Sequence, residues 1–230
     1  MAMKHIIDFH AHILPNADHG CDSIEMCKKQ LEMAKKAGIT HIVATPHFYP
    51  NEDSVESFLS KRERAYEMYK SINDADKLPV VLKGAEVLVW KNMDKMKNIE
   101  KLCIEGTNTI LIELPFSKRF GQEIIDTLMG IRKRGLEIVL AHVERYDKKE
   151  IAKLIEKGFF VQLNTYSVIM LGKRKLCKEY LSSNQVVALG SDIHGLKNRY
   201  KSFAKVIKKL GSGANDIMQE SYKRCNSEQL

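Results

Sequence analysis

The sequence predicts an α/β protein whose parallel strands close into a barrel. Strand-like apolar runs alternate with helical patterns along all 230 residues, and this alternation favours a parallel sheet. Candidate metal ligands stand at the carboxyl ends of at least six of these strands. In an open sheet those ends would spread along a row, at about 4.8 Å per strand. A barrel gathers them around one mouth, which makes it the better explanation.

Seven strands are expected, each followed by a helix or a loop. They lie near 5–12, 41–47, 80–87, 109–115, 137–144, 159–164 and 186–192. No linker, internal repeat or low-complexity segment divides the chain, and its 44% hydrophobic content is enough for a sizeable core. We therefore expect one domain over 1–230.

Helical patterns occupy most of the intervals between these strands. The helix expected at 24–36 has Ser23 as a candidate N-cap, and Gly38 fits its C-terminal stop. The next begins near residue 53 and keeps apolar side chains at helical spacing to about residue 72. Further helices are expected near 121–134, 148–157, 174–181, 199–210 and 213–223.

Charge and cysteine content argue against several classes of protein. The net charge is +8, but most lysines lie on helical segments and no nucleic-acid-binding module stands out. We expect a solvated basic face that steers a phosphorylated substrate, and no binding of nucleic acid. No apolar stretch reaches the roughly 18 residues of a membrane span, so we expect a cytoplasmic protein without membrane insertion. The five cysteines lack CxxC spacing, which argues against a disulfide framework and a zinc ribbon.

The strongest functional signal is an alternating motif in the first strand. Asp8, His10 and His12 occupy every second position there, so their side chains point to the same side. A His-x-His pair alone is also compatible with hydrogen-bonded core histidines. Other strand-like runs end in further candidate ligands, namely His47, Glu86, Glu113, His142, Asp192 and His194. Their convergence predicts a polynuclear metal centre.

Five short motifs resemble those of the PHP (polymerase and histidinol phosphatase) superfamily. They lie at 8–15 (DFHAHILP), 44–47 (ATPH), 84–86 (GAE), 141–146 (AHVERY) and 191–194 (SDIH). Within it, the combination of Thr-Pro-His with Ala-His-Val-Glu-Arg-Tyr is most similar to bacterial manganese-dependent protein-tyrosine phosphatases of capsular and exopolysaccharide gene clusters. The resemblance implies the PHP fold, a distorted (β/α)7 TIM-like barrel, with three divalent metal ions at its C-terminal mouth.

The resemblance also implies which residues hold each metal ion. The first ion would be bound by His10, His12, Glu86 and Asp192. The second would be bound by Glu113, His142 and Glu86, which bridges the two ions. The third would be bound by His19, His47 and His194. The resemblance implies manganese as the metal. Related phosphatases carry Asp-Asp-Gly where this chain has Asp18-His19-Gly20, and the imidazole in place of a carboxylate favours iron or zinc more than an oxygen-rich site would.

Such a centre hydrolyses a phosphate ester without a protein nucleophile. Metal ions bridged by Glu86 would share a hydroxide that attacks phosphorus. No cysteine is followed six residues later by arginine, so the Cys-x5-Arg loop of cysteine-dependent tyrosine phosphatases is absent. Asp8 is expected to orient ligands rather than to bind metal. His5 and His41, at the beginnings of strands, are expected to be structural or surface residues.

Three further residues are catalytic candidates. Arg145 is the first choice for a clamp on the phosphoryl oxygens, a role that requires the chain to leave strand geometry near Glu144. Its alternative is a structural ion pair with a nearby carboxylate. Arg199 is a second candidate for the clamp. Asp18 is either a general acid or a loop carboxylate.

Several functions remain in competition. The leading hypothesis is a phosphatase that acts on phosphotyrosine in a protein, with a tyrosine kinase of polysaccharide export as the partner. The alternative enzyme is a small-molecule phosphatase with a substrate such as histidinol phosphate. A non-catalytic PHP module and a proofreading nuclease are less favoured, the first because every expected ligand position holds a competent residue.

Overall fold

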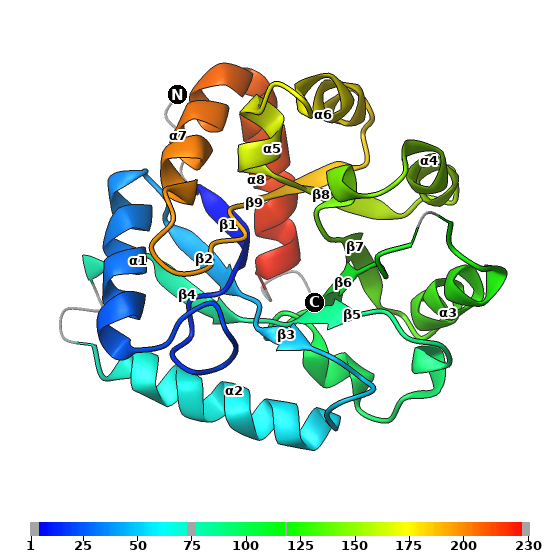
Figure 1. The fold of residues 1–230 in the computed structure, drawn as a ribbon, viewed down its shortest axis with the longest axis horizontal. Coiled ribbons are helices and arrows are strands. Elements are labelled where there is room, and N and C mark those ends of the chain that lie inside the picture. Colours follow the sequence, from blue (N-terminus) through cyan, green and yellow to red (C-terminus); the bar gives the residue numbers. More distant parts are fainter. Residues whose placement is uncertain (1–4, 73–76, 118, 227–230) are drawn as a thin grey trace.

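Every strand in the described part of the chain runs parallel to its neighbours. The computed structural model describes residues 5–72, 77–117 and 119–226. Its strands are β1 (Ile7–Ala11), β2 (His41–Ala44), β3 (His47–Phe48), β4 (Val80–Lys83), β5 (Glu86–Leu88), β6 (Thr109–Glu113), β7 (Glu137–Leu140), β8 (Phe160–Asn164) and β9 (Val186–Gly190). Most helices lie outside these strands, which occupy the centre of the view (Figure 1). The expected α/β class with parallel strands is confirmed.

The strands form two sheets. The predicted strands 41–47 and 80–87 are each divided into two shorter strands, one in each sheet. One sheet has the order β1-β2-β4 and the other the order β3-β5-β6-β7-β8-β9. The break between β2 and β3 falls at Thr45 and Pro46, and that between β4 and β5 falls beside it at Gly84 and Ala85. Backbone bonds span the breaks, from Gly84 N to Ala44 O (2.9 Å) and from Glu86 N to Pro46 O (3.1 Å). The segments expected at 41–47 and 80–87 therefore pass from one sheet to the other.

The two sheets also meet at the carboxyl ends of β1 and β9. Asp192 N donates to His10 O at 2.8 Å, and His12 N donates to Ile193 O at 3.2 Å. The loops that follow these two strands, dark blue and orange in Figure 1, consequently lie together. This contact joins the first predicted ligands of the chain to the last ones.

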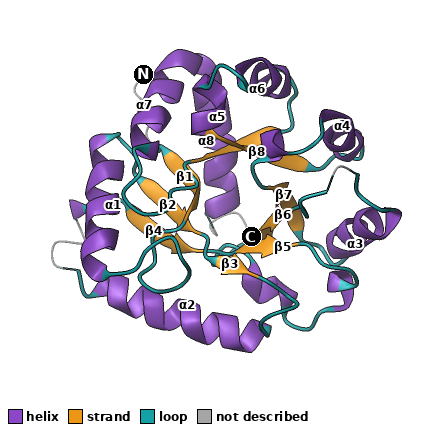
Figure 2. Ribbon diagram, in the orientation of Figure 1, coloured by secondary structure: helices purple, strands orange, loops and turns teal. Residues whose placement is uncertain are grey.

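The helices begin and end close to the predicted positions. They are α1 (Ile24–Lys36), α2 (Val55–Lys70), α3 (Gln122–Lys133), α4 (Lys148–Glu156), α5 (Thr165–Ile169), α6 (Arg174–Leu181), α7 (Arg199–Leu210) and α8 (Ser212–Cys225), with short 3-10 turns η2 (Met93–Lys95), η3 (Ile99–Leu102) and η4 (Val143–Arg145) (Figure 2). Ser23 caps α1 by accepting from Met26 N at 3.2 Å. The short helix α5, directly after β8, was not predicted. No helix among the described residues is both long enough and apolar enough to cross a bilayer.

Candidate metal centre

The two histidines of the first motif meet above the end of β1. His10 Nε2 lies 3.1 Å from His12 Nε2, and both side chains are buried. Asp192 Oδ1 lies 3.8 Å from the first of these nitrogens and 3.6 Å from the second. The alternation of side chains along β1 and the contact between β1 and β9 thus produce the group expected for the first metal ion.

Glu86 stands at the centre of the site, as the expected bridge requires. Its Oε2 lies 3.1 Å from His10 Nε2, 3.2 Å from His12 Nε2 and 3.0 Å from His47 Nδ1. This oxygen and the His47 nitrogen are both buried, and neither has a hydrogen-bond partner among the described residues. Burial would raise the pKa of Glu86, but the positive charge of His10 and the hydrogen bond between His142 and Oε1 hold it well below its usual value. A cation between these atoms satisfies all of them.

The second expected group lies on the other oxygen of Glu86. His142 Nε2 is 2.7 Å from Glu86 Oε1 and 3.6 Å from Glu113 Oε1. Burial and the negative charge of Glu86 raise the pKa of Glu113 to about 7. Two buried carboxylates held this close repel one another, and a divalent cation between them removes that penalty.

The third group departs from the expected partition. Nitrogen atoms of His12, His47 and His194 lie within 4.8 Å of one another, and so do atoms of His47, Glu86 and Glu113. His19 is exposed, with its ring centroid 5.1 Å from that of His47 and 4.7 Å from that of His194. All nine predicted ligands therefore converge, but His47 faces two groups and His19 lies at the rim.

The backbone is strained at two of the ligand positions. His142 has a φ angle of 33° and Asp192 has one of 50°, in the left-handed region that non-glycine residues rarely adopt. Such conformations cost about 1 to 3 kcal/mol and persist where the surrounding structure imposes them. At both positions the strand has just ended, and the bend turns the side chain toward the centre.

Asp18 contacts the site through His12. Its Oδ2 lies 2.6 Å from His12 Nδ1 and accepts from His47 N at 3.0 Å, while Oδ1 accepts from Gly20 N at 2.8 Å. Burial opposes ionisation, but the His12 and backbone hydrogen bonds lower the pKa of Asp18 below its usual value. The bond to Nδ1 leaves Nε2 of His12 to face Glu86, which is the arrangement of a carboxylate that orients a metal-binding imidazole.

A layer of buried polar residues supports the ligands. Asp8 accepts from Ser191 N at 2.8 Å and from Ser191 Oγ at 2.6 Å, so it fixes the turn before Asp192. Gln162 Oε1 accepts from His142 N at 2.8 Å, and Asn164 Nδ2 donates to Asp192 Oδ2 at 2.9 Å. Sequence reasoning missed these two residues of β8, although polar side chains at alternate positions of a buried strand were a signal.

Arg145 lies beside the predicted ligands, where the phosphate clamp was expected. The chain leaves strand geometry at His142 and forms the turn η4, which meets the condition set for this residue. Its guanidinium pairs with Asp192 Oδ2, and the side chain as a whole is 37% exposed. The structure thus shows the ion pair that was the alternative for Arg145, and the partner in this pair is itself a predicted ligand.

Arg199 lies at the edge of the site. In the part of the chain that the structure describes, it contacts none of the nine predicted ligands. Its guanidinium carbon lies 4.4 Å from the ring centroid of Tyr166, which belongs to α5. The residue begins α7, shortly after His194. It thus stands farther from the metal centre than Arg145.

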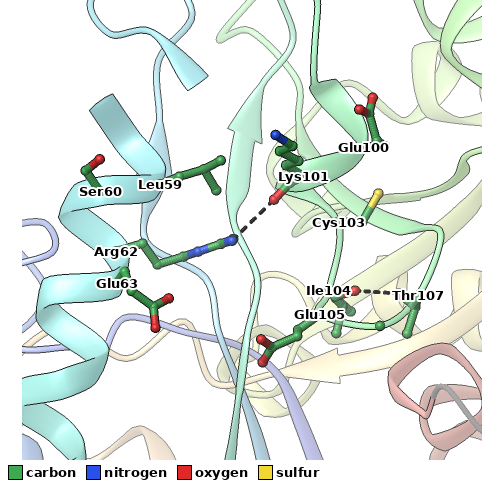
Figure 3. Close-up of a pocket in the computed structure, with 11 residues that line it drawn as sticks. Leu59, Ser60, Arg62, Glu63, Glu100, Lys101, Cys103, Ile104, Glu105 and Thr107 are labelled. Carbon is green, nitrogen blue, oxygen red and sulfur yellow. Dashed lines mark hydrogen bonds between the residues drawn. The ribbon is translucent and has the colours of Figure 1, made fainter. Parts of the chain in front are cut away.

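A pocket of about 530 Å³ lies away from the metal centre, between α2 and the segment 100–107 (Figure 3). None of the predicted ligands lines it. Its buried Arg62 donates to Gly84 O at 2.8 Å and to Lys101 O at 3.2 Å. Because Gly84 marks the break between β4 and β5, Arg62 supports the bend that carries Glu86 into the centre.

Comparison with known proteins is consistent with this geometry. The model of a family described as capsular polysaccharide synthesis, CpsB/CapC, matches residues 6–230. The tyrosine-protein phosphatase CpsB of Streptococcus pneumoniae is 30% identical over 252 residues, covering 98% of this chain and 100% of that protein. The tyrosine-protein phosphatase YwqE of Bacillus subtilis is 31% identical over 215 residues, covering 84% of this chain and 79% of that protein.

Solved structures show the same fold. A structure described as YwqE from Bacillus subtilis and CpsB from Streptococcus pneumoniae, unique metal-dependent tyrosine phosphatases, has a TM-score of 0.80 at 24% identity, covering 96% of this chain and 95% of that chain. A histidinol phosphate phosphatase from Lactococcus lactis, complexed with zinc, L-histidinol and phosphate, has a TM-score of 0.56 at 15% identity, covering 89% of this chain and 93% of that chain.

Proposed function

We propose that this chain, which belongs to the capsular polysaccharide synthesis family CpsB/CapC, is a metal-dependent protein-tyrosine phosphatase. CpsB of Streptococcus pneumoniae and YwqE of Bacillus subtilis are both named tyrosine-protein phosphatases. The solved structure of these two proteins is described as one of metal-dependent tyrosine phosphatases. The observation that carries the proposal is the buried Oε2 of Glu86, which touches three imidazole nitrogens without a hydrogen bond.

The proposed centre holds three divalent metal ions at the C-terminal mouth of a distorted barrel. Its ligands are His10, His12, His19, His47, Glu86, Glu113, His142, Asp192 and His194. Manganese is the proposed ion, and the imidazole of His19 also suits iron or zinc. When bound, the ions would acidify water toward neutral pH and neutralise charge on the phosphoryl group.

The side chains around the ligands supply binding and orientation. Arg145, at the mouth and partly exposed, would bind phosphoryl oxygens through its two-pronged guanidinium. Asp18 would hold the ring of His12 in place rather than donate a proton, because its pKa is lowered and its oxygens are already bonded. A tyrosine leaving group has a pKa of about 10, so the demand for an acid is modest.

The proposed substrate is a phosphotyrosine protein, specifically a tyrosine kinase that controls polysaccharide export. The description of the family as one of capsular polysaccharide synthesis supports this choice. The likeness to the histidinol phosphate phosphatase is at 15% identity, so it supports the fold alone.

A pair of histidine variants tests the proposal. In the presence of Mn²⁺ we expect His10→Ala/His12→Ala to lose about 10³-fold or more in kcat/KM on a phosphotyrosine peptide, because the centre loses two ligands. Elemental analysis should show less bound metal in the same variant. The wild type should hydrolyse the peptide faster than histidinol phosphate.

His5→Ala/His41→Ala is the matched control. His5 stacks on Tyr222, and His41 meets the rings of both residues edge-on, away from the metal centre. The control should keep its metal and its activity. Undiminished phosphatase activity in the His10→Ala/His12→Ala variant, or a preference for histidinol phosphate in the wild type, would contradict the proposal.

A further inference from the structure

The excess positive charge of the chain comes from two short stretches. Residues 165–178 contain four lysines and arginines, residues 193–215 contain six, and neither stretch contains an aspartate or glutamate. The remainder of the chain holds 27 lysines and arginines against 29 aspartates and glutamates. The net charge of +8 is therefore concentrated rather than spread over the surface.

These two stretches lie side by side where they begin, next to the metal centre. The first follows the carboxyl end of β8 and the second follows that of β9, and α5 packs against α7 (Figure 1). Arg199 covers the ring of Tyr166 at 4.4 Å. Asn164, two residues before Tyr166, donates to Asp192, the partner of Arg145. The basic surface is thus continuous with the edge of the site that holds the proposed phosphate clamp.

Apolar side chains are exposed among these charges. Tyr166 is 43% exposed, Leu171 90% and Leu196 47%. Phe116 and Trp90, also exposed, follow β6 and β5 at the same end of the strands. Of the large hydrophobic residues exposed in the described part of the chain, Val80 alone stands at the beginning of a strand, away from this end. Exposed apolar residues therefore gather where the substrate must enter.

We infer that this surface, the β8–β9 rim, selects phosphotyrosine in a segment with acidic and apolar neighbours. The rim consists of Tyr166, Leu171, Arg174, Leu196, Lys197 and Arg199. The inference rests on the proposed phosphatase function and adds the chemistry of the substrate around the phosphorylated residue. Cations from two stretches that contain no carboxylate attract acidic side chains, and the exposed leucines and tyrosine provide apolar contacts beside them.

A peptide explains both properties of the rim better than the competing partners do. A small phosphate ester would not extend beyond the metal ions and Arg145. A membrane of anionic lipid would be attracted by the same charge, but binding to lipid does not require the basic surface to adjoin Asp192 and Asn164 at the metal centre. A chain that carries phosphotyrosine into the centre must leave it across the surrounding loops.

The test compares three phosphotyrosine peptides that differ only in their flanking residues, which are glutamate, glutamine or lysine. With the metal-loaded wild type we expect kcat/KM to be about tenfold higher for the glutamate peptide than for the glutamine peptide, and lowest for the lysine peptide. The difference should shrink in 0.5 M salt, because exposed charges are then screened. Free O-phosphotyrosine serves as the substrate without flanks.

Two charge-reversal variants locate the effect. Arg174→Glu/Lys197→Glu alters the rim, whereas Lys208→Glu/Lys209→Glu makes the same change of charge at the other end of α7. The first should reduce the preference for glutamate to about twofold or less while it hydrolyses free O-phosphotyrosine like the wild type. The second should keep the preference. Leu171→Ser/Leu196→Ser should lower kcat/KM on all three peptides by about threefold to tenfold, and Val80→Ser should not.

Each outcome separates this inference from the function beneath it. No hydrolysis of free O-phosphotyrosine or of any of the peptides would overturn the phosphatase function itself. Hydrolysis without a preference, or equal loss of preference in both charge-reversal variants, would overturn the role of the rim alone. A third outcome would assign the rim to an anionic lipid surface instead. In that case the wild type shows no preference among the peptides but binds phosphatidylserine vesicles, and Arg174→Glu/Lys197→Glu abolishes this binding.

Discussion

At the scale of single residues, two of the predicted ligands, Asp192 and His12, are each contacted by two other side chains. Arg145 and Asn164 both bond to Asp192 Oδ2, and Asp18 and Glu86 contact opposite nitrogens of His12. Each contact fixes one donor or acceptor of a predicted ligand. Substitutions that keep the size of a side chain but change its bonding should therefore separate orientation from metal binding.

Arg145→Lys should lower kcat/KM on a phosphotyrosine peptide about 100-fold without loss of bound metal. Lysine keeps the charge but cannot bind two phosphoryl oxygens in one plane. Steady-state kinetics with elemental analysis measures both effects. Arg132→Lys, whose arginine packs on Phe159 outside the site, is the control. Near-normal activity of Arg145→Lys would limit this residue to its ion pair with Asp192.

Asp18→Asn should weaken metal affinity about 10- to 100-fold, because the amide cannot fix the ring of His12 as a carboxylate does. Titration of the metal-free protein with Mn²⁺ measures the dissociation constant. Asp22→Asn changes an exposed carboxylate of the same loop and should bind metal like the wild type. An unchanged constant in Asp18→Asn would return Asp18 to the role of a general acid or a simple loop residue.

At the scale of elements, the ends of strands carry the site, and close packing between strands sets its dimensions. An added Cβ on Gly190, the last residue of β9, would lie 2.6 Å from both His10 Cβ and Gln162 Nε2. β9 can therefore approach β1 and β8 this closely only with glycine at that position. This approach brings Asp192 to His10 in β1 and to His12 directly after it.

Gly190→Ala should destabilise the protein by about 2 kcal/mol and reduce metal binding, because His10 and Gln162 must move. Urea denaturation and metal titration measure the two effects. Gly172→Ala is the control, since an added Cβ there meets nothing within 4 Å. If Gly190→Ala retained normal metal affinity, the close approach of β9 would not determine the geometry of the centre.

At the scale of the whole molecule, the proposed metal ions connect strands from both sheets. Their ligands follow or belong to β1 in one sheet and β3, β5, β6, β7 and β9 in the other. Backbone bonds and the buried polar layer also connect the two sheets in this region. Metal binding should therefore stabilise the fold as well as the activity.

Removal of metal with a chelator should abolish activity and lower Tm by about 10 °C, and Mn²⁺ should restore both. Binding at a thousandfold excess over Kd contributes about 4 kcal/mol, and each kcal/mol shifts Tm by about 2–4 °C in a chain of this size. Differential scanning calorimetry checks the shift. The His10→Ala/His12→Ala variant should respond less, and an equal response in it would place the stabilising metal elsewhere.

The sequence by itself determined most of the elements and the kinds of residue at the candidate site. Helices 24–36, 174–181 and 199–210 begin and end as predicted, because caps and helical periodicity depend on residues within a few positions of each other. The placement of histidines and carboxylates after strands likewise required only local patterns, and the family resemblance supplied their grouping.

Tertiary structure alone decided how these pieces meet. It divided the segments 41–47 and 80–87 between two sheets, placed His47 opposite Glu86, and brought Gln162 and Asn164 behind the ligands. It also set Arg199 on Tyr166 and gathered the basic stretches on one rim. These contacts join residues far apart in the chain, and they depend on which backbone groups and side chains can pack together, which no local pattern encodes.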